Sequence, residues 1–99
     1  MTERYFEWDP LKNLSNQRKH GVSFEEAAKV FDDDLHLSIQ DRIEGNELRW
    51  QTYGRVDGYL LLMVAHTLLD EDEDGTVEIV RIISARPATR KERNWYENG

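Results

Sequence analysis

The stretch LRWQTYGRVDGYLLLMVAHT, residues 48–67, carries the strongest fold signal in the chain. Its first half, Leu48–Val56, alternates polar and apolar side chains with the period of two that is typical of a half-buried strand. Asp57 and Gly58 follow, a pair that tolerates the positive φ angles of a tight hairpin turn. The second half, Tyr59–Thr67, is almost wholly apolar, as in a central strand. The stretch therefore predicts a hairpin at the centre of a sheet.

Further segments on both sides of this hairpin have strand character. Residues 4–8 form a short aromatic run, and residues 35–39 place leucine and isoleucine at every second position. A charged loop is expected over residues 41–46. Val and Ile dominate residues 77–85, which an acidic turn over residues 68–75 joins to the hairpin.

The first helix is expected over residues 11–20, where the composition is helical and polar. Asp9 is the expected N-cap, Pro10 occupies the first helical position, and Gly21 follows as the stop. These signals predict a helix directly after the first strand.

Two more helices follow from start signals. Ser23 and Glu26 form a capping-box pattern, which predicts a helix that ends near Phe31. Pro87 is expected to open a last helix that runs to about Tyr96. The predicted fold is α+β: a small antiparallel sheet of about four strands with two N-terminal helices and one C-terminal helix, in a single domain over residues 1–99. The helices are expected mainly on one face, which leaves the other free for a ligand or partner.

Composition excludes several classes of protein. The 99 residues include no cysteine, which rules out disulfides and cysteine-based zinc sites. The longest apolar run, residues 59–65, is too short to cross a bilayer. We therefore expect a cytoplasmic protein without a membrane partner.

The net charge of −7 argues against nucleic-acid binding when it is taken alone. The charges are distributed unevenly, however. Acidic residues gather at 32–34 and 70–74, whereas basic residues gather between 81 and 93 and again between 12 and 19. A local basic area can therefore coexist with a global acidic balance.

The three histidines are the first candidates for acid–base chemistry, because imidazole titrates near neutral pH. His20 ends the first predicted helix, where it is either a catalytic group or a cation that favours the helix dipole. His66 lies near the end of the apolar strand and is either functional or bonded to the backbone. His36 is interpreted as a surface residue.

Arginines on the predicted strands are the second set of candidates. Arg49 and Arg55 flank one strand and share a face by its period of two. Arg81 lies in a Val/Ile strand and needs a partner for its charge, either an acidic residue or a phosphate. Ser84 and Arg86 continue toward the strand end, where the N-terminus of the last helix is expected to favour an anion.

These residue types suit metal-independent RNA cleavage. Attack by a 2′-OH needs a base, an acid and positive charge on the phosphorane-like transition state. Histidine and arginine supply all three. The sequence contains no HExxH motif and no close histidine pair, so neither a metal nor another cofactor is expected.

The motifs together resemble the BrnT toxin family over nearly the whole chain. The stretches KHGVSFEEA, residues 19–27, and RIISARPATRKER, residues 81–93, carry most of the resemblance. FEWDPLKN at residues 6–13 adds to it, as do Asn16 and further positions spread along the chain.

This resemblance implies a RelE-like ribonuclease toxin of a type II toxin–antitoxin pair, one that inhibits translation. It implies RNA as substrate and a BrnA-type antitoxin as protein partner, with DNA bound only through the antitoxin. Carried over by position, the implied catalytic residues are His20, His66, Arg81 and Arg86. The implied substrate-binding residues are Lys19, Arg49 and Ser84.

A second interpretation of the same residues is a non-catalytic interaction module. In it the open sheet face serves only to dock an antitoxin-like partner, Arg81 and Arg86 form ion pairs, and His20 caps a helix. A cleft with converging donors favours the enzyme. A flat apolar face whose arginines meet acidic partners favours the module.

Overall fold

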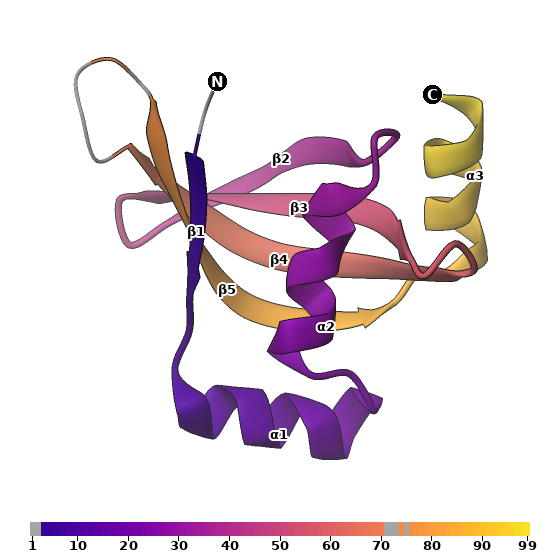
Figure 1. Ribbon diagram of the computed structural model, residues 1–99, viewed down its shortest axis with the longest axis horizontal. Helices are drawn as coiled ribbons and strands as arrows, with labels where there is room; N and C mark the ends of the chain where they lie inside the picture. Colours follow the sequence, from indigo (N-terminus) through magenta and orange to yellow (C-terminus); the bar gives the residue numbers. More distant parts are fainter. Residues whose placement is uncertain (1–2, 71–73, 75) are drawn as a thin grey trace.

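The predicted hairpin forms the middle of a five-stranded sheet (Figure 1). Strands β3 (Glu47–Val56) and β4 (Leu60–Asp70) pair antiparallel, and the turn between them has the positive φ angles that its Asp-Gly pair favours. β2 (Leu37–Glu44) flanks β3, and β5 (Val77–Pro87) flanks β4, both antiparallel. The computed structural model describes residues 3–70, 74 and 76–99.

The prediction of about four antiparallel strands is wrong, because the sheet has five strands and is mixed. β1 (Glu3–Glu7) lies at the edge and pairs parallel with β5, in the order β1-β5-β4-β3-β2. The two strands lie at opposite ends of the sequence. Local patterns identify a strand, but they do not specify a distant partner or its direction.

The first two helices begin where their capping signals predicted. α1 (Pro10–His20) is capped by Asp9, whose carboxylate accepts a hydrogen bond from the Leu11 N–H at 2.9 Å. α2 (Phe24–Ala28) has both halves of its capping box. It is shorter than expected, since the chain continues as the 3₁₀ helix η1 (Lys29–Asp32).

Three element boundaries differ from the prediction. The expected loop over residues 41–46 is mostly strand, because β2 continues to Glu44 past a register shift. Pro87 ends β5, and α3 (Arg90–Asn98) starts after its N-cap Thr89. β4 continues to Asp70, so residues 68–70 of the expected acidic turn are strand, and residues 71–73 and 75 lie outside the described part.

The core lies between the sheet and the α2–η1 segment, which crosses one face of the sheet in Figure 1. Phe24, Ala27 and Val30 pack there against Leu62 and Val64 of β4. α3 lies toward the other face, where the Trp95 ring meets Tyr53 edge-on with ring centroids 6.1 Å apart. The expected open face is therefore covered in part. Within the described residues, no helix has the length and apolar character needed to span a bilayer.

Candidate functional site

A β-bulge brings the polar residues of β5 to one face of the sheet. In an unbroken strand Arg81 and Arg86 would point to opposite faces, because they are five positions apart and side chains alternate with a period of two. The register shifts between Ala65 and His66 of β4, which leaves Ile83 as the extra residue of β5. The pairs on the resulting common face are Arg81 with Thr67, Ser84 with Ala65 and Arg86 with Met63.

Arg49 of β3 lies on the same face. Its neighbour Trp50 is paired with His66, whose side chain lies on the core face, so Arg49 points the other way. The Arg49 Nε is buried and has no hydrogen-bond partner among the described residues. We call the surface formed by Arg49, Arg81, Ser84 and Arg86 the arginine face.

Among the described residues, Arg81 has one side-chain partner, and the contact is weak. Its Nη1 lies 3.2 Å from the Glu7 carboxylate on the neighbouring edge strand, and both side chains are 50% exposed. An exposed pair of this kind contributes on the order of 0–1 kcal/mol. Most of the Arg81 donors are therefore available to a ligand.

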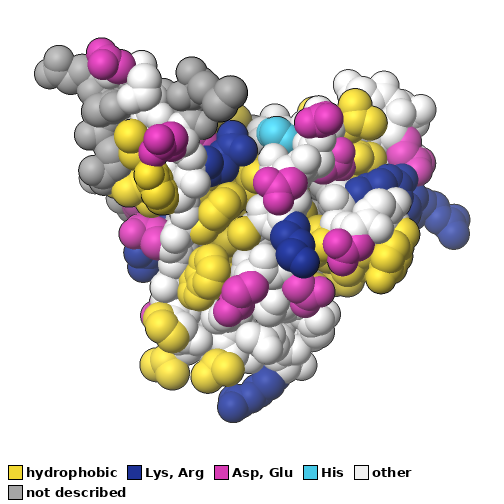
Figure 2. Space-filling model, viewed as in Figure 1, with side chains coloured by type: hydrophobic (Ala, Val, Ile, Leu, Met, Phe, Trp, Pro, Cys, Tyr) yellow, Lys and Arg dark blue, Asp and Glu magenta, His cyan; other side chains and the backbone are white. Residues whose placement is uncertain are grey.

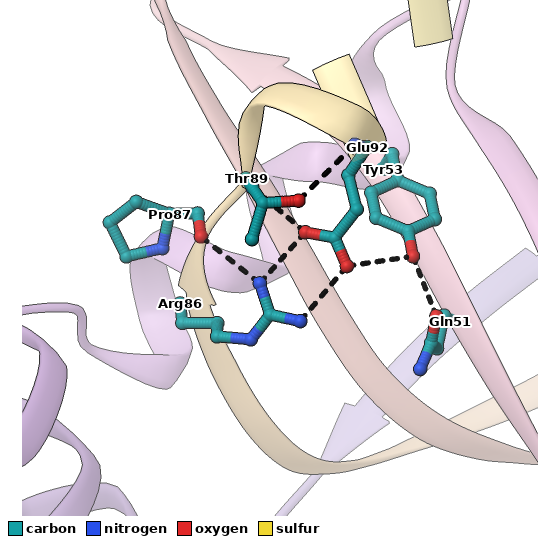
Figure 3. A network of polar contacts seen from close by, with 6 residues as sticks. All are labelled: Gln51, Tyr53, Arg86, Pro87, Thr89 and Glu92. Atoms are coloured by element: carbon teal, nitrogen blue, oxygen red, sulfur yellow. Dashed lines mark hydrogen bonds and ion pairs between the residues drawn. The ribbon is translucent and has the colours of Figure 1, made fainter. Parts of the chain in front are cut away.

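Arg86 is held more firmly, by a network shown in Figure 3. Its two Nη atoms lie 2.8 and 2.9 Å from the two carboxylate oxygens of Glu92 in α3. The Glu92 carboxylate also accepts a hydrogen bond from the Thr89 N–H, and the Tyr53 hydroxyl lies between Glu92 and Gln51. Glu92 is only 7% exposed, so the carboxylate of this ion pair is shielded from water, whereas the Arg86 side chain is 31% exposed.

The pKa values in this network follow from its contacts. The hydrogen bonds from Arg86 lower the pKa of Glu92 to about 2, so Glu92 is a carboxylate at neutral pH. Burial, with the nearby Glu92 charge, raises the pKa of Tyr53 to about 12. Tyr53 is therefore a neutral phenol.

His66 lies on the opposite face, in the core, and is 1% exposed. Its Nδ1 lies 3.2 Å from the Thr67 carbonyl oxygen, which can only accept, so Nδ1 carries the proton. Its Nε2 then accepts from the Thr52 hydroxyl at 2.7 Å, and Thr52 accepts from Ser38 at 2.8 Å. The Phe31 ring covers the imidazole edge-on at 5.1 Å. Burial lowers the pKa of His66 to about 4, so the ring is neutral and both nitrogens are occupied.

Lys19 and His20 lie beside the arginine face, at the end of α1. With Ser84 they line a small pocket between α1 and β5. Neither side chain forms a hydrogen bond or ion pair with a residue that the structure describes. Both are also in the last helical turn, where a cation favours the dipole.

The structure thus brings together six of the seven candidate residues and separates one. Arg49, Arg81, Ser84 and Arg86 share a face, with Lys19 and His20 at its border next to Ser84, whereas His66 lies behind the sheet. The sequence analysis missed Glu92. Its signal was the capping-box spacing of Thr89 and Glu92, which also marks the true start of α3.

Other parts of the described chain offer weaker candidates. Figure 2 shows the face that carries α2, where Lys and Arg side chains are interspersed with Asp and Glu. No group of three or more His, Asp or Glu with the geometry of a metal site occurs in residues 3–70, 74 and 76–99. The arginine face is therefore the best candidate site.

Comparisons with known proteins agree with this fold. A family model described as the ribonuclease toxin BrnT of type II toxin–antitoxin systems matches residues 8–92. The fold is similar to the 1.1 Å crystal structure of the Brucella abortus ribonuclease toxin BrnT, with a TM-score of 0.60 and 20% identity. That alignment covers 90% of this chain and 100% of the Brucella chain, and at this identity it shows the fold alone. Curated proteins give no match.

The family match places the chain in the class of ribonuclease toxins of type II toxin–antitoxin systems. Within that class, the chain belongs to the BrnT family.

Proposed function

We propose that this chain cleaves RNA without a metal, that the arginine face is its active site, and that the cleavage inhibits translation in the cytoplasm. The observation that carries the proposal is the β5 bulge, which turns Arg81, Ser84 and Arg86 to the face that also holds Arg49. The guanidinium groups of Arg49 and Arg81, beside the small side chains of Ser84 and Ala65, suit a phosphate, which guanidinium binds bidentately.

The proposed roles follow from how far the polar groups of each residue are already bonded inside the chain. Arg49 and Arg81 clamp the scissile phosphate and stabilise the phosphorane-like transition state. The Ser84 hydroxyl donates to a phosphate oxygen, and Lys19 binds the backbone beside it. His20 takes the 2′-OH proton or protonates the leaving 5′ oxygen.

Two of the implied catalytic residues, His66 and Arg86, already have their polar groups bonded inside the chain. Both ring nitrogens of His66 are bonded inside the core, which supports a structural role for that ring. Arg86 is bound to Glu92 at both Nη atoms, which supports a positioning role at the rim of the arginine face.

We also propose a BrnA-type antitoxin as the protein that neutralises this toxin, with any contact to DNA made through the antitoxin. The type II class of the family supports a protein partner, because toxin and antitoxin form a protein pair in such systems.

The alternative function is a non-catalytic module that only binds an antitoxin-like partner. One observation favours it: Arg81 and Arg86 both have acidic partners inside the chain, as that interpretation predicts. Two observations argue against it: the Arg81–Glu7 pair is exposed, and the buried Arg49 Nε has no hydrogen-bond partner in the part of the chain that the structure describes.

Inducible expression in a bacterium separates the two functions. We expect the wild type to stop growth, and Arg49→Gln and Arg81→Gln to relieve the arrest at equal protein level. Arg42→Gln is the matched control, since Arg42 pairs with Asp41 and Glu44 of its own exposed strand. Growth that is unaffected by a folded wild type would instead support the module.

A further inference from the structure

One face of α1 presents a polar stripe to the edge of β5. Lys12, Ser15, Asn16 and Lys19 have the spacing i, i+3, i+4 and i+7, which places them along one side of a helix. These four residues line the pocket that Ser84 and His20 also border. The stripe thus adjoins the arginine face at Ser84.

Asn16 fixes this stripe in place. Its side-chain Nδ2 donates to the Ala85 carbonyl at 2.8 Å, and its Oδ1 accepts from the Ala85 N–H at 3.1 Å. The same Nδ2 lies 2.9 Å from the Val22 carbonyl, and Asn16 is buried. Since Ala85 follows Ser84 directly, these bonds set the distance between the α1 stripe and the Ser84 hydroxyl.

The pocket has the chemistry of an anion site. Its polar lining consists of two lysines, a histidine, two serines and an asparagine. Lys12 and Lys19 are exposed and pair with no acidic residue in the described part of the chain. Seven residues at 1.5 Å each separate them by about 10 Å along the axis, so one ammonium group flanks each end of the stripe.

A larger hollow elsewhere on the molecule has the opposite charge. Asp32, Asp33, Asp34, Asp57 and Glu97 line it, with only Lys29 and Arg55 as cations. A polyanion that leaves the arginine face is therefore attracted toward α1 and repelled from this acidic hollow.

We propose that Lys12 is a further RNA-binding residue, which with Lys19 holds a phosphate adjacent to the scissile one in the pocket between α1 and β5. This inference rests on the proposed function, because it takes the arginine face as the place of cleavage. The RNA then runs from the arginine face over Ser84 and along α1.

The test is binding of a fluorescent 2′-O-methyl RNA oligonucleotide, which cannot be cleaved, measured by anisotropy over a range of salt concentrations. Each lost phosphate contact on a single strand should make the slope of log K against log salt shallower by about 0.7. We expect Lys12→Gln to weaken binding about three- to tenfold at low salt with this change in slope. Lys12→Arg should keep the affinity and the salt slope near their wild-type values.

Lys29→Gln is the control, because Lys29 is an exposed lysine of the acidic hollow. If Lys12→Gln matches Lys29→Gln while Arg81→Gln binds weakly, the inference about Lys12 is overturned and the proposed function stands. If the folded wild type does not bind the oligonucleotide, both are overturned. Equal urea midpoints for the two lysine variants exclude a loss of fold.

Discussion

The side-chain amide of Asn16 pairs with both backbone groups of Ala85, as a neighbouring strand would. β1 ends at Glu7, which lies beside Arg81, so the remaining edge of β5 has no strand partner there. At Ala85 the Asn16 side chain of α1 bonds to the backbone groups of this edge in place of a strand, so the helix covers the sheet edge. This contact joins the candidate cations of α1 to the arginine face.

Replacing Asn16 should therefore destabilise the fold more than its helical position suggests. Asn16→Ala leaves the Ala85 N–H and two buried carbonyls without partners, which should lower the free energy of unfolding by about 2–4 kcal/mol. Urea denaturation measures this. Ser15→Ala, an exposed neighbour on the same helix, should change it by less than about 0.5 kcal/mol. Similar values for the two variants would contradict the edge-pairing role.

The buried His66 should make stability depend on pH below neutrality. Its folded pKa of about 4 lies under the ordinary value of 6.5, so the unfolded chain binds the proton first. The contribution is complete above pH 6.5 and is lost as the pH falls toward 4. Between pH 7 and pH 5 the wild type should lose about 2 kcal/mol from this group. Urea unfolding at both pH values measures it.

The comparison variant is His66→Gln, which has no group that titrates in this range. It should be less stable than the wild type at pH 7 and change far less between pH 7 and pH 5. A wild type whose stability is the same at the two pH values would show that His66 is not a neutral core residue.

Gly54 should tolerate no side chain, because η1 crosses β3 in contact with it. A Cβ there would lie 2.7 Å from the Val30 carbonyl oxygen and 2.8 Å from the Val30 Cγ1. We expect Gly54→Ala to cost about 3 kcal/mol in thermal or urea unfolding. Gly45→Ala meets no atom within 4 Å but has a φ of 58°, and should cost about 1 kcal/mol. The reverse order of the two costs would contradict this packing.

The Arg86–Glu92 pair should be coupled in a double-mutant cycle. Glu92→Gln keeps a side chain that can serve in the capping box but removes the charge that Arg86 contacts. We expect each of Glu92→Gln and Arg86→Gln to cost about 2 kcal/mol, and the double variant to cost much less than their sum. Additive costs would mean that Arg86 is not held by Glu92. The Arg4–Glu78 pair is the control, because its acid is more exposed than Glu92 and it has a single contact, with coupling below about 1 kcal/mol.

Local sequence signals predicted most elements of the fold. The Asp57-Gly58 turn, the Asp9 cap and the Ser23 capping box each act within a few residues, so their patterns fix a turn or a helix start. The parallel pairing of β1 with β5 could not be predicted in this way. It depends on contacts between residues more than 70 positions apart.

The candidate site shows the same limit. Sequence patterns identified the chemistry of Arg81 and Arg86, but strand alternation alone would place them on opposite faces. The bulge at Ile83 has no glycine or proline to mark it, and it depends on the pairing with β4. The core position of His66 likewise depends on Phe31 and Thr52, which come from other elements.

The most direct test of the central claim is the chemistry of RNA ends in cells that express the toxin. RNA is isolated after induction of the wild type and of Arg49→Gln, Arg81→Gln and Arg42→Gln, and new 5′ and 3′ ends are mapped. We expect fragments with 2′,3′-cyclic phosphate ends in the wild type and in Arg42→Gln, and far fewer in the other two variants. Intact RNA in cells that hold folded wild-type protein, or as much cleavage by Arg49→Gln and Arg81→Gln as by the wild type, would contradict the assignment of the arginine face as a ribonuclease site.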